Sequence, residues 1–181
     1  MRFVIIHGAY GNLEENWLPW LRKGLEEDGH EVIIPRFPTP EGQTLENWLK
    51  IFDGRELNEN TIIIGHSLGV PFSLTLLEKH KVKAAFFVAG FVEKLNVEKY
   101  NKINASFIEK EFDWNAIKQN CSTFYVYVSD NDYNVPLEIG KAVAYKLGVE
   151  PIIIRGAGHF NTKAGYDKFP KLLEDIKTLI D

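Results

Sequence analysis

The pentapeptide Gly65-His66-Ser67-Leu68-Gly69 has the residue types that can activate a serine as a nucleophile. It stands between the apolar run TIII and the helical pattern VPFSLTLLEKH. A Gly-X-Ser-X-Gly sequence between a strand and a helix is typical of a nucleophile elbow, a strained turn that lifts the serine hydroxyl clear of the sheet. Its glycines leave room for neighbouring backbone, and the N–H groups of the following helix face developing negative charge. The context favours this function over a Gly/Ser turn that only connects two elements.

A serine becomes a good nucleophile only when a base takes its proton, and the base needs a carboxylate that fixes its tautomer. In this type of site an acid and then a histidine follow the serine, each in a loop after a strand. Asp132 follows the run TFYVYV, and His159 follows the segment PIIIRGAG. We therefore predict Ser67 as nucleophile, His159 as base and Asp132 as acid. Asp130 remains an alternative acid, because the segment DNDYN is rich in turn formers and either aspartate there could be a solvated loop residue.

Four other histidines compete with His159 for the role of the base. His30 and His80 stand at helix-to-strand connections, at the opposite edge of the expected sheet. His7 and His66 stand at the same edge as Ser67, but elbow geometry turns the residue before the serine away from it. The sequence thus favours His159.

Acyl transfer also requires an oxyanion hole, usually made by two backbone N–H groups. One should belong to Leu68, the residue after the nucleophile, and the other to the loop HGAYG after the first apolar run. We predict Ala9 as the second donor, with Tyr10 in reserve. The alternative is that Gly8 and Gly11 are ordinary turn residues.

Short apolar runs alternate with amphipathic stretches along the whole chain, and these elements must position the reactive residues. Helical spacing covers Leu13 to Asp28, Ser67 to Lys79, Leu137 to Leu147 and Tyr166 to Ile180. The runs between them are apolar on successive residues, as expected of strands covered on both faces. They are FVII, VII, TIII, AAFFVA, TFYVYV and PIII. This alternation predicts an α/β fold with a mostly parallel sheet, and the absence of a linker predicts one domain over residues 1–181.

The composition excludes several function classes. With 21 basic and 25 acidic side chains the net charge is −4, which predicts neither a nucleic acid nor a membrane as partner. No apolar run approaches the length of a membrane span, and the N-terminal run is too short for a signal-peptide core. Cys121 is the only cysteine, so no internal disulfide forms. No metal-ligand spacing and no nucleotide-binding glycine motif occurs, so we expect no metal, no cofactor and a cytoplasmic protein.

With these residues assembled, the chain resembles the α/β-hydrolases, and more narrowly the compact retinoblastoma-binding-protein-type serine hydrolases. The resemblance covers nearly the whole chain and is carried by the segments VIIHG, NWLPWL, GHSLG, FDWNAIKQNC, SDNDYNVP and GAGHFN. It implies Ser67, Asp132 and His159 as the catalytic triad. It also implies the minimal version of the fold, with six strands in the spatial order 2-1-3-4-5-6 and helices on both faces.

Residues 91–120 are too few for a helical cap domain beside one short helix in FDWNAIKQN. We therefore expect an open site under at most a small flap at residues 97–112. The aromatic candidates for its walls are Tyr10, Trp17, Trp48, Phe91 and Phe160.

The predicted function is a serine hydrolase that cleaves small carboxylic esters, with thioesters or small amides as further candidates, through an acyl-enzyme. The expected partner is a small acyl substrate, and the sequence does not indicate an oligomeric state. The alternative is a protein-binding module on a hydrolase scaffold with vestigial activity, because the family name itself carries a reported binding role.

Overall fold

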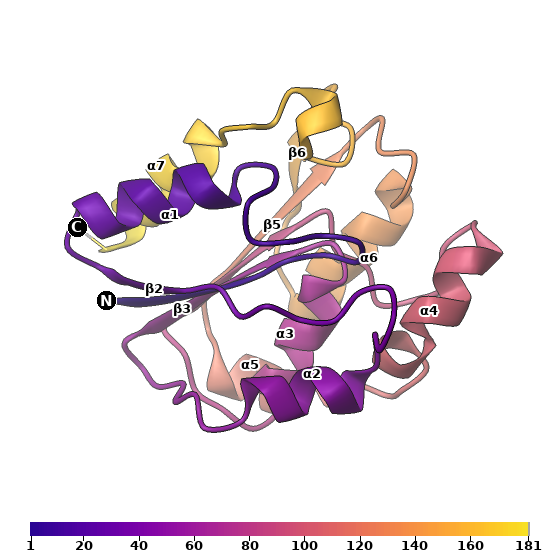
Figure 1. Ribbon diagram of the computed structural model, residues 1–181, viewed down its shortest axis with the longest axis horizontal. Helices are drawn as coiled ribbons and strands as arrows, with labels where there is room; N and C mark the ends of the chain where they lie inside the picture. Colours follow the sequence, from indigo (N-terminus) through magenta and orange to yellow (C-terminus); the bar gives the residue numbers. More distant parts are fainter. Residues whose placement is uncertain (181) are drawn as a thin grey trace.

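A computed structural model describes residues 1–180 and contains a parallel sheet of six strands (Figure 1). Neighbouring strands follow the order β2-β1-β3-β4-β5-β6, and every pair is parallel. This order confirms the arrangement implied by the family resemblance. The strands are β1 (Arg2–Ile6), β2 (Glu31–Ile33), β3 (Thr61–His66), β4 (Ala84–Val88), β5 (Phe124–Ser129) and β6 (Ile152–Ile154).

The central strands are buried on both faces because helices cover both sides of the sheet. All six residues of β3 are buried, which explains a run with no polar alternation. In β1, Val4 belongs to the core on one face, whereas Phe3 and Ile5 belong to the core on the other. The edge strands β2 and β6 are short and only partly buried.

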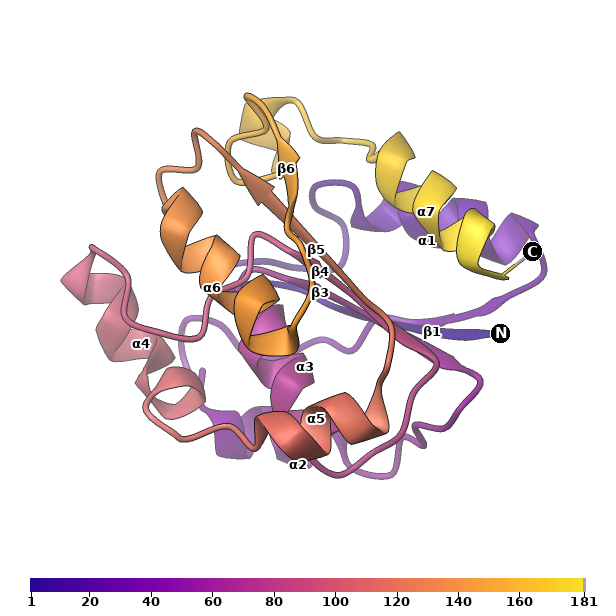
Figure 2. The same cartoon turned by 180° about the vertical axis from the view of Figure 1, so that it is seen from behind.

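Helices α1 and α7 lie on one face of the sheet, and α2, α3, α5 and α6 lie on the other (Figures 1 and 2). Helix α3, which starts directly after the turn at Ser67, is buried along its whole length, and its two polar side chains, Ser73 and Thr75, donate to backbone carbonyls one turn earlier. The helices are α1 (Leu18–Glu27), α2 (Leu45–Phe52), α3 (Gly69–Leu77), α4 (Glu98–Ile108), α5 (Trp114–Asn120), α6 (Leu137–Leu147) and α7 (Pro170–Ile180), with a 3₁₀ turn, η1 (Thr162–Ala164). None of the helices in residues 1–180 has the length and apolarity to cross a membrane.

Two predicted helices start later than their apolar spacing suggested, and backbone chemistry explains both. Helix α1 begins at Leu18 rather than Leu13, because Asn16 has a left-handed φ of 57° that interrupts any helix. Helix α7 begins at Pro170, which lacks an N–H and disfavours helical backbone at the residue before it.

The segment expected to be a small flap forms helix α4 and is anchored in the core. Phe107 is fully buried and packs edge-on against Trp48, with ring centroids 5.0 Å apart. Helices α4 and α5 together occupy the connection between β4 and β5, so no separate cap domain is inserted at this point of the described residues 1–180. The sequence predicted one helix in this connection, in the segment FDWNAIKQN, whereas the structure has α4 in addition to α5.

Candidate active site

Ser67 occupies a strained turn between the end of β3 and the start of α3. Its φ is 54°, a left-handed conformation that a non-glycine residue adopts only when its surroundings enforce it. Its N–H donates to Val88 O at 2.9 Å, which ties the turn to β4. A Cβ on Gly69 would lie 2.3 Å from Ile6 O, and one on Gly65 would lie 2.9 Å from Gly69 O. The two glycines of the motif are thus required by close backbone approach.

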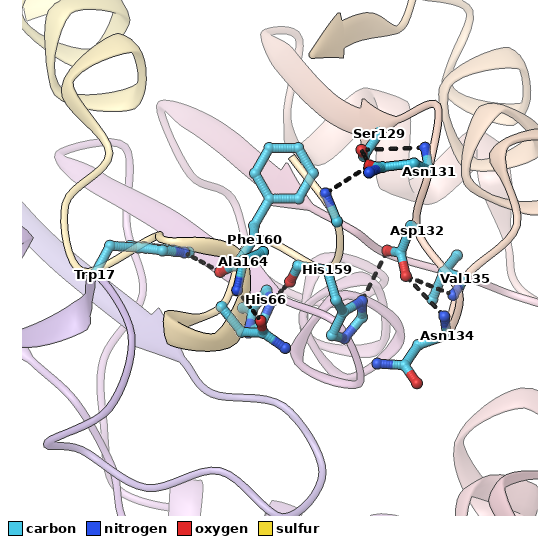
Figure 3. A network of polar contacts seen from close by, with 12 residues as sticks. Trp17, His66, Ser129, Asn131, Asp132, Asn134, Val135, His159, Phe160 and Ala164 are labelled. Atoms are coloured by element: carbon cyan, nitrogen blue, oxygen red, sulfur yellow. Dashed lines mark hydrogen bonds and ion pairs between the residues drawn. The ribbon is translucent and has the colours of Figure 1, made fainter. Parts of the chain in front are cut away.

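His159 and Asp132 form a buried pair at the same edge of the sheet (Figure 3). Their side chains meet through His159 Nδ1 and Asp132 Oδ2, 2.7 Å apart. The other carboxylate oxygen, Oδ1, accepts from the backbone N–H groups of Asn134 at 2.8 Å and Val135 at 3.0 Å. Because Asp132 accepts the Nδ1 proton, the neutral imidazole keeps an unprotonated Nε2 that can act as a base.

Ser67 and His159 line one cavity of about 860 Å³. Within residues 1–180, Ser67 Oγ makes no hydrogen bond to His159. Catalytic hydrogen bonds are often long before substrate binds and tighten in the complex, so this geometry is compatible with proton transfer.

Asp130, the alternative acid, contacts the backbone of the loop that carries His159 rather than its imidazole. Its Oδ1 accepts from Gly156 N at 2.8 Å. Asn131 acts similarly, since its Oδ1 accepts from Gly158 N at 2.7 Å (Figure 3). Both side chains hold the loop after β6 against the loop after β5, and the geometry pairs His159 with Asp132.

His66 supports His159 through the backbone. Its Nε2 lies 3.0 Å from His159 O, so this nitrogen carries a proton and donates it (Figure 3). Burial, followed by the neighbouring imidazole of His159, lowers the pKa of His66 to about 3. A neutral His66 is therefore a positioning residue, a role that sequence reasoning missed when it only excluded His66 as the base.

His7 holds the loop after β1 with both ring nitrogens. Its Nδ1–H donates to Gly8 O at 2.8 Å, and its Nε2 accepts from Phe37 N at 3.1 Å. Burial lowers the pKa of His7, which keeps the ring neutral. Gly8 C=O and Ala9 N–H belong to one trans peptide group and point in opposite directions. Because Gly8 O faces the His7 ring, the Ala9 N–H points away from that ring.

The two N–H groups predicted for the oxyanion hole have no partner within residues 1–180. Neither Ala9 N nor Leu68 N donates a hydrogen bond there. The loop bearing Ala9 lies directly against Ser67, since a Cβ on Gly8 would lie 2.9 Å from Ser67 Cβ. Free N–H groups beside the serine are what a tetrahedral oxyanion requires.

Of the aromatic residues expected in the cavity wall, Tyr10 and Phe91 line it. Trp17 and Phe160 instead lie in the core between the sheet and helices α1 and α7, where Trp17 Nε1 donates to Phe160 O at 3.1 Å. Trp48 is also buried in the core and stacks on Phe37. These three side chains correct the expectation, because their contacts are all internal. Residues of the wall that sequence reasoning missed include Leu95, Tyr100, Asn104, Tyr133 and Val135.

No group of metal-ligating side chains large enough to hold an ion occurs within residues 1–180. Burial raises the pKa of the Cys121 thiol to about 11, which makes it an inert core residue rather than a second nucleophile.

Comparison with known proteins matches residues 3–178 to the family model described as serine hydrolase. The protein YdeN of Bacillus subtilis (strain 168) is 29% identical over 96% of this chain and 93% of its own length. The serine hydrolase RBBP9 of Rattus norvegicus is 28% identical over 98% of this chain and 94% of its own.

Solved structures agree with this result. The crystal structure of the ydeN gene product from B. subtilis superposes with a TM-score of 0.90 at 28% identity, covering 98% of this chain and 97% of that one. Est1E from Butyrivibrio proteoclasticus shares the fold at a TM-score of 0.70 and 17% identity, covering 99% of this chain and 88% of its own. The chain therefore belongs to the serine hydrolase family and is a hydrolytic enzyme with the α/β-hydrolase fold.

Proposed function

We propose that the protein hydrolyses small carboxylic esters through an acyl-enzyme on Ser67, with His159 as general base and Asp132 as the acid. The observation that carries the proposal is the 2.7 Å contact between His159 and Asp132 beside the cavity that Ser67 also lines. A cavity of about 860 Å³ is in the range that holds small molecules. Thioesters and small amides carry the same reacting carbonyl and are included as substrates.

In the first half-reaction Ser67 Oγ attacks the substrate carbonyl carbon while its proton passes to His159 Nε2. Asp132 stabilises the resulting imidazolium, and the N–H groups of Ala9 and Leu68 stabilise the oxyanion. The tetrahedral intermediate then expels the alcohol, which takes the proton from His159. Water attacks the acyl-enzyme by the same steps in reverse and releases the carboxylic acid and free Ser67.

The polar surroundings keep the base in its active form. Asp132 holds the proton on Nδ1, and the hydrogen bond from His66 to His159 O fixes the backbone of the same residue. Loss of either contact would leave Ser67 with a misplaced or wrongly protonated base. We further propose that residues 1–181 form one domain that acts in the cytoplasm, where Cys121 stays reduced.

A fluorophosphonate probe with intact-mass readout tests the proposal. The wild-type protein should gain one adduct, and Ser67→Ala and His159→Ala should gain none while staying folded. Ser122→Ala removes an exposed serine and is the matched control, which should label like the wild type. The turnover of a para-nitrophenyl ester should fall by about 10⁶ for Ser67→Ala. A folded wild-type protein that takes no adduct would overturn the proposal in favour of a binding scaffold with vestigial activity.

A further inference from the structure

Asn104 is a buried polar residue on α4 that faces the active-site cavity. It is 3% exposed and yet lines the cavity with Ser67. A buried side-chain amide needs partners for both its oxygen and its nitrogen. Its oxygen has one, because Gln43 Nε2 donates to Asn104 Oδ1 at 2.8 Å.

The orientation of the Asn104 amide is fixed by a chain of hydrogen bonds that starts at the backbone. Tyr10 N–H donates to Thr39 Oγ1, so the Thr39 hydroxyl proton is free to donate to Gln43 Oε1. The Gln43 amide nitrogen then faces Ile103 O at 3.0 Å, a carbonyl that can only accept. Gln43 Nε2 uses its two protons on Ile103 O and Asn104 Oδ1, so Asn104 must turn its oxygen to Gln43 and its nitrogen away from it.

The Asn104 Nδ2 group is consequently a donor without a protein partner. Within residues 1–180 it donates no hydrogen bond. Every fully enclosed side-chain nitrogen or oxygen in these residues has a partner, so the unpartnered Nδ2 is not fully enclosed. Nδ2 is therefore exposed to open space, and the open space next to Asn104 is the active-site cavity. A fixed donor at a buried wall selects ligands that place an acceptor oxygen there.

We propose that Asn104 is a specificity-determining residue that binds a second, uncharged carbonyl oxygen on the acyl chain of the substrate. This inference rests on the proposed ester hydrolysis and names the acyl group that the site prefers. The substrate class is an ester whose acyl part carries a ketone or amide carbonyl beyond the one that reacts.

The charges around the cavity favour a neutral acceptor over a carboxylate. Lys99 and Lys163 line the cavity, and so do Glu14 and Glu15. The formal charges of these four side chains sum to zero, so the lining carries no excess positive charge that would favour an anion over a neutral ligand. A neutral amide donor then matches a neutral carbonyl acceptor.

The position of the network indicates the acyl side of the substrate. It begins at Tyr10, next to Ala9, whose N–H is proposed to hold the oxygen of the reacting acyl group. The leaving alcohol must instead approach His159, which follows β6. In Figures 1 and 2, η1, which follows His159 in the chain, lies at the top of both views, and α4 lies well below it. Asn104 on α4 is therefore placed on the acyl side of the substrate, away from the leaving alcohol.

The test compares para-nitrophenyl esters of linear fatty acids with esters of equal chain length that carry one ketone oxygen, moved along successive carbons. For at least one ketone position, the wild-type kcat/KM should exceed that of the plain ester by about 10-fold, the value of one net hydrogen bond. The difference should appear mainly in KM, because Asn104 does not contact the reacting atoms.

Asn104→Asp is the decisive variant. Aspartate can still accept from Gln43, but it presents an oxygen where Nδ2 donated, so the preference for the ketone ester should fall to about one or below. The ratio of two substrates on one protein does not depend on the folded fraction. Asn115→Asp makes the same chemical change at an exposed position of α5 and should keep the wild-type ratio. Gln43→Met, which releases the amide of Asn104, should lose part of the preference.

The outcomes separate this inference from the proposed function. If the wild type hydrolyses the plain and ketone esters equally at every ketone position, the inference is overturned and ester hydrolysis stands. The same holds if Asn104→Asp keeps the wild-type preference. If the wild type hydrolyses no ester and takes no fluorophosphonate adduct, both proposals are overturned.

Discussion

Asp132→Asn changes one atom of the proposed triad, and the structure determines which way the new amide must face. The wild-type Oδ1 accepts from two backbone N–H groups, those of Asn134 and Val135, while Oδ2 accepts from His159 Nδ1. An asparagine that keeps its oxygen toward the two N–H groups turns its NH₂ toward Nδ1. The reverse orientation would set a donor against two donors and lose two hydrogen bonds, each worth about 1 kcal/mol.

The favoured orientation of the amide reverses the imidazole tautomer. An NH₂ that donates to Nδ1 leaves the proton of His159 on Nε2, the nitrogen that must accept the proton of Ser67. Substitutions of this kind lower turnover by about 10⁴, which corresponds to about 5 kcal/mol of transition-state stabilisation. The fold should be retained, because the new side chain keeps the two backbone contacts.

The assay follows the turnover of a para-nitrophenyl ester beside the rate of fluorophosphonate labelling. Asp130→Asn is the matched control, since its remaining carbonyl oxygen can still accept from Gly156 N. Asp132→Asn should be slowed in both assays, and Asp130→Asn should resemble the wild type. If Asp132→Asn kept more than a tenth of the activity, or if Asp130→Asn were the crippled variant, the assignment of the acid would be refuted.

Two further predictions concern stability. Gly69→Ala places a Cβ 2.3 Å from Ile6 O and should lower the free energy of unfolding, measured in urea, by about 3 kcal/mol or more. The control is Gly24→Ala inside α1, whose Cβ meets only a side chain at 3.4 Å and which should be neutral or stabilising. Equal effects of the two substitutions would contradict the close approach at Gly69. Because the pKa of His66 is about 3 in the folded protein and 6.5 in the unfolded chain, protons bind preferentially to the unfolded chain between these values. The free energy of unfolding should therefore fall by up to about 5 kcal/mol as the pH drops through this window. His66→Gln should flatten that dependence and the exposed control His80→Gln should not; an unchanged pH dependence in His66→Gln would refute the assignment.

The nucleophile elbow could be predicted because its residue pattern is contiguous in the sequence, although Gly69 makes its close approach to Ile6 O of the neighbouring strand β1. Gly65 and Gly69 are required by backbone contacts that any such turn makes, and the left-handed φ of Ser67 belongs to the same turn. His159 could be found because the parallel strands carry successive loops to one edge of the sheet. The choice of Asp132 over Asp130 was favoured by the sequence, and the tertiary structure adds the reason, since only Asp132 reaches the imidazole.

The strand order followed from the family resemblance, because periodicity does not say which strands are neighbours. Nor could the apolar stripe of residues 13–28 show whether Trp17 faces the core or the cavity, since both surroundings favour an aromatic side chain. In the folded protein α1 lies beside α7, and Trp17 is buried in the core with its ring between His66 of β3 and Phe169.

The residues to which we assign supporting roles at the site could not be identified from the sequence, for a different reason. His66, Gln43 and Asn104 have ordinary residue types in unremarkable local patterns, and each acquires its role from a partner far along the chain. The polarity of the Asn104 amide depends on hydrogen bonds that pass from the β1 loop through Gln43 to α4, and only packing brings these segments together. The sequence by itself therefore determined the fold class and the likeness to serine hydrolases, since these follow from local geometry and chain order. The tertiary structure alone decided what surrounds the reacting atoms, because those contacts join residues that are distant in the sequence.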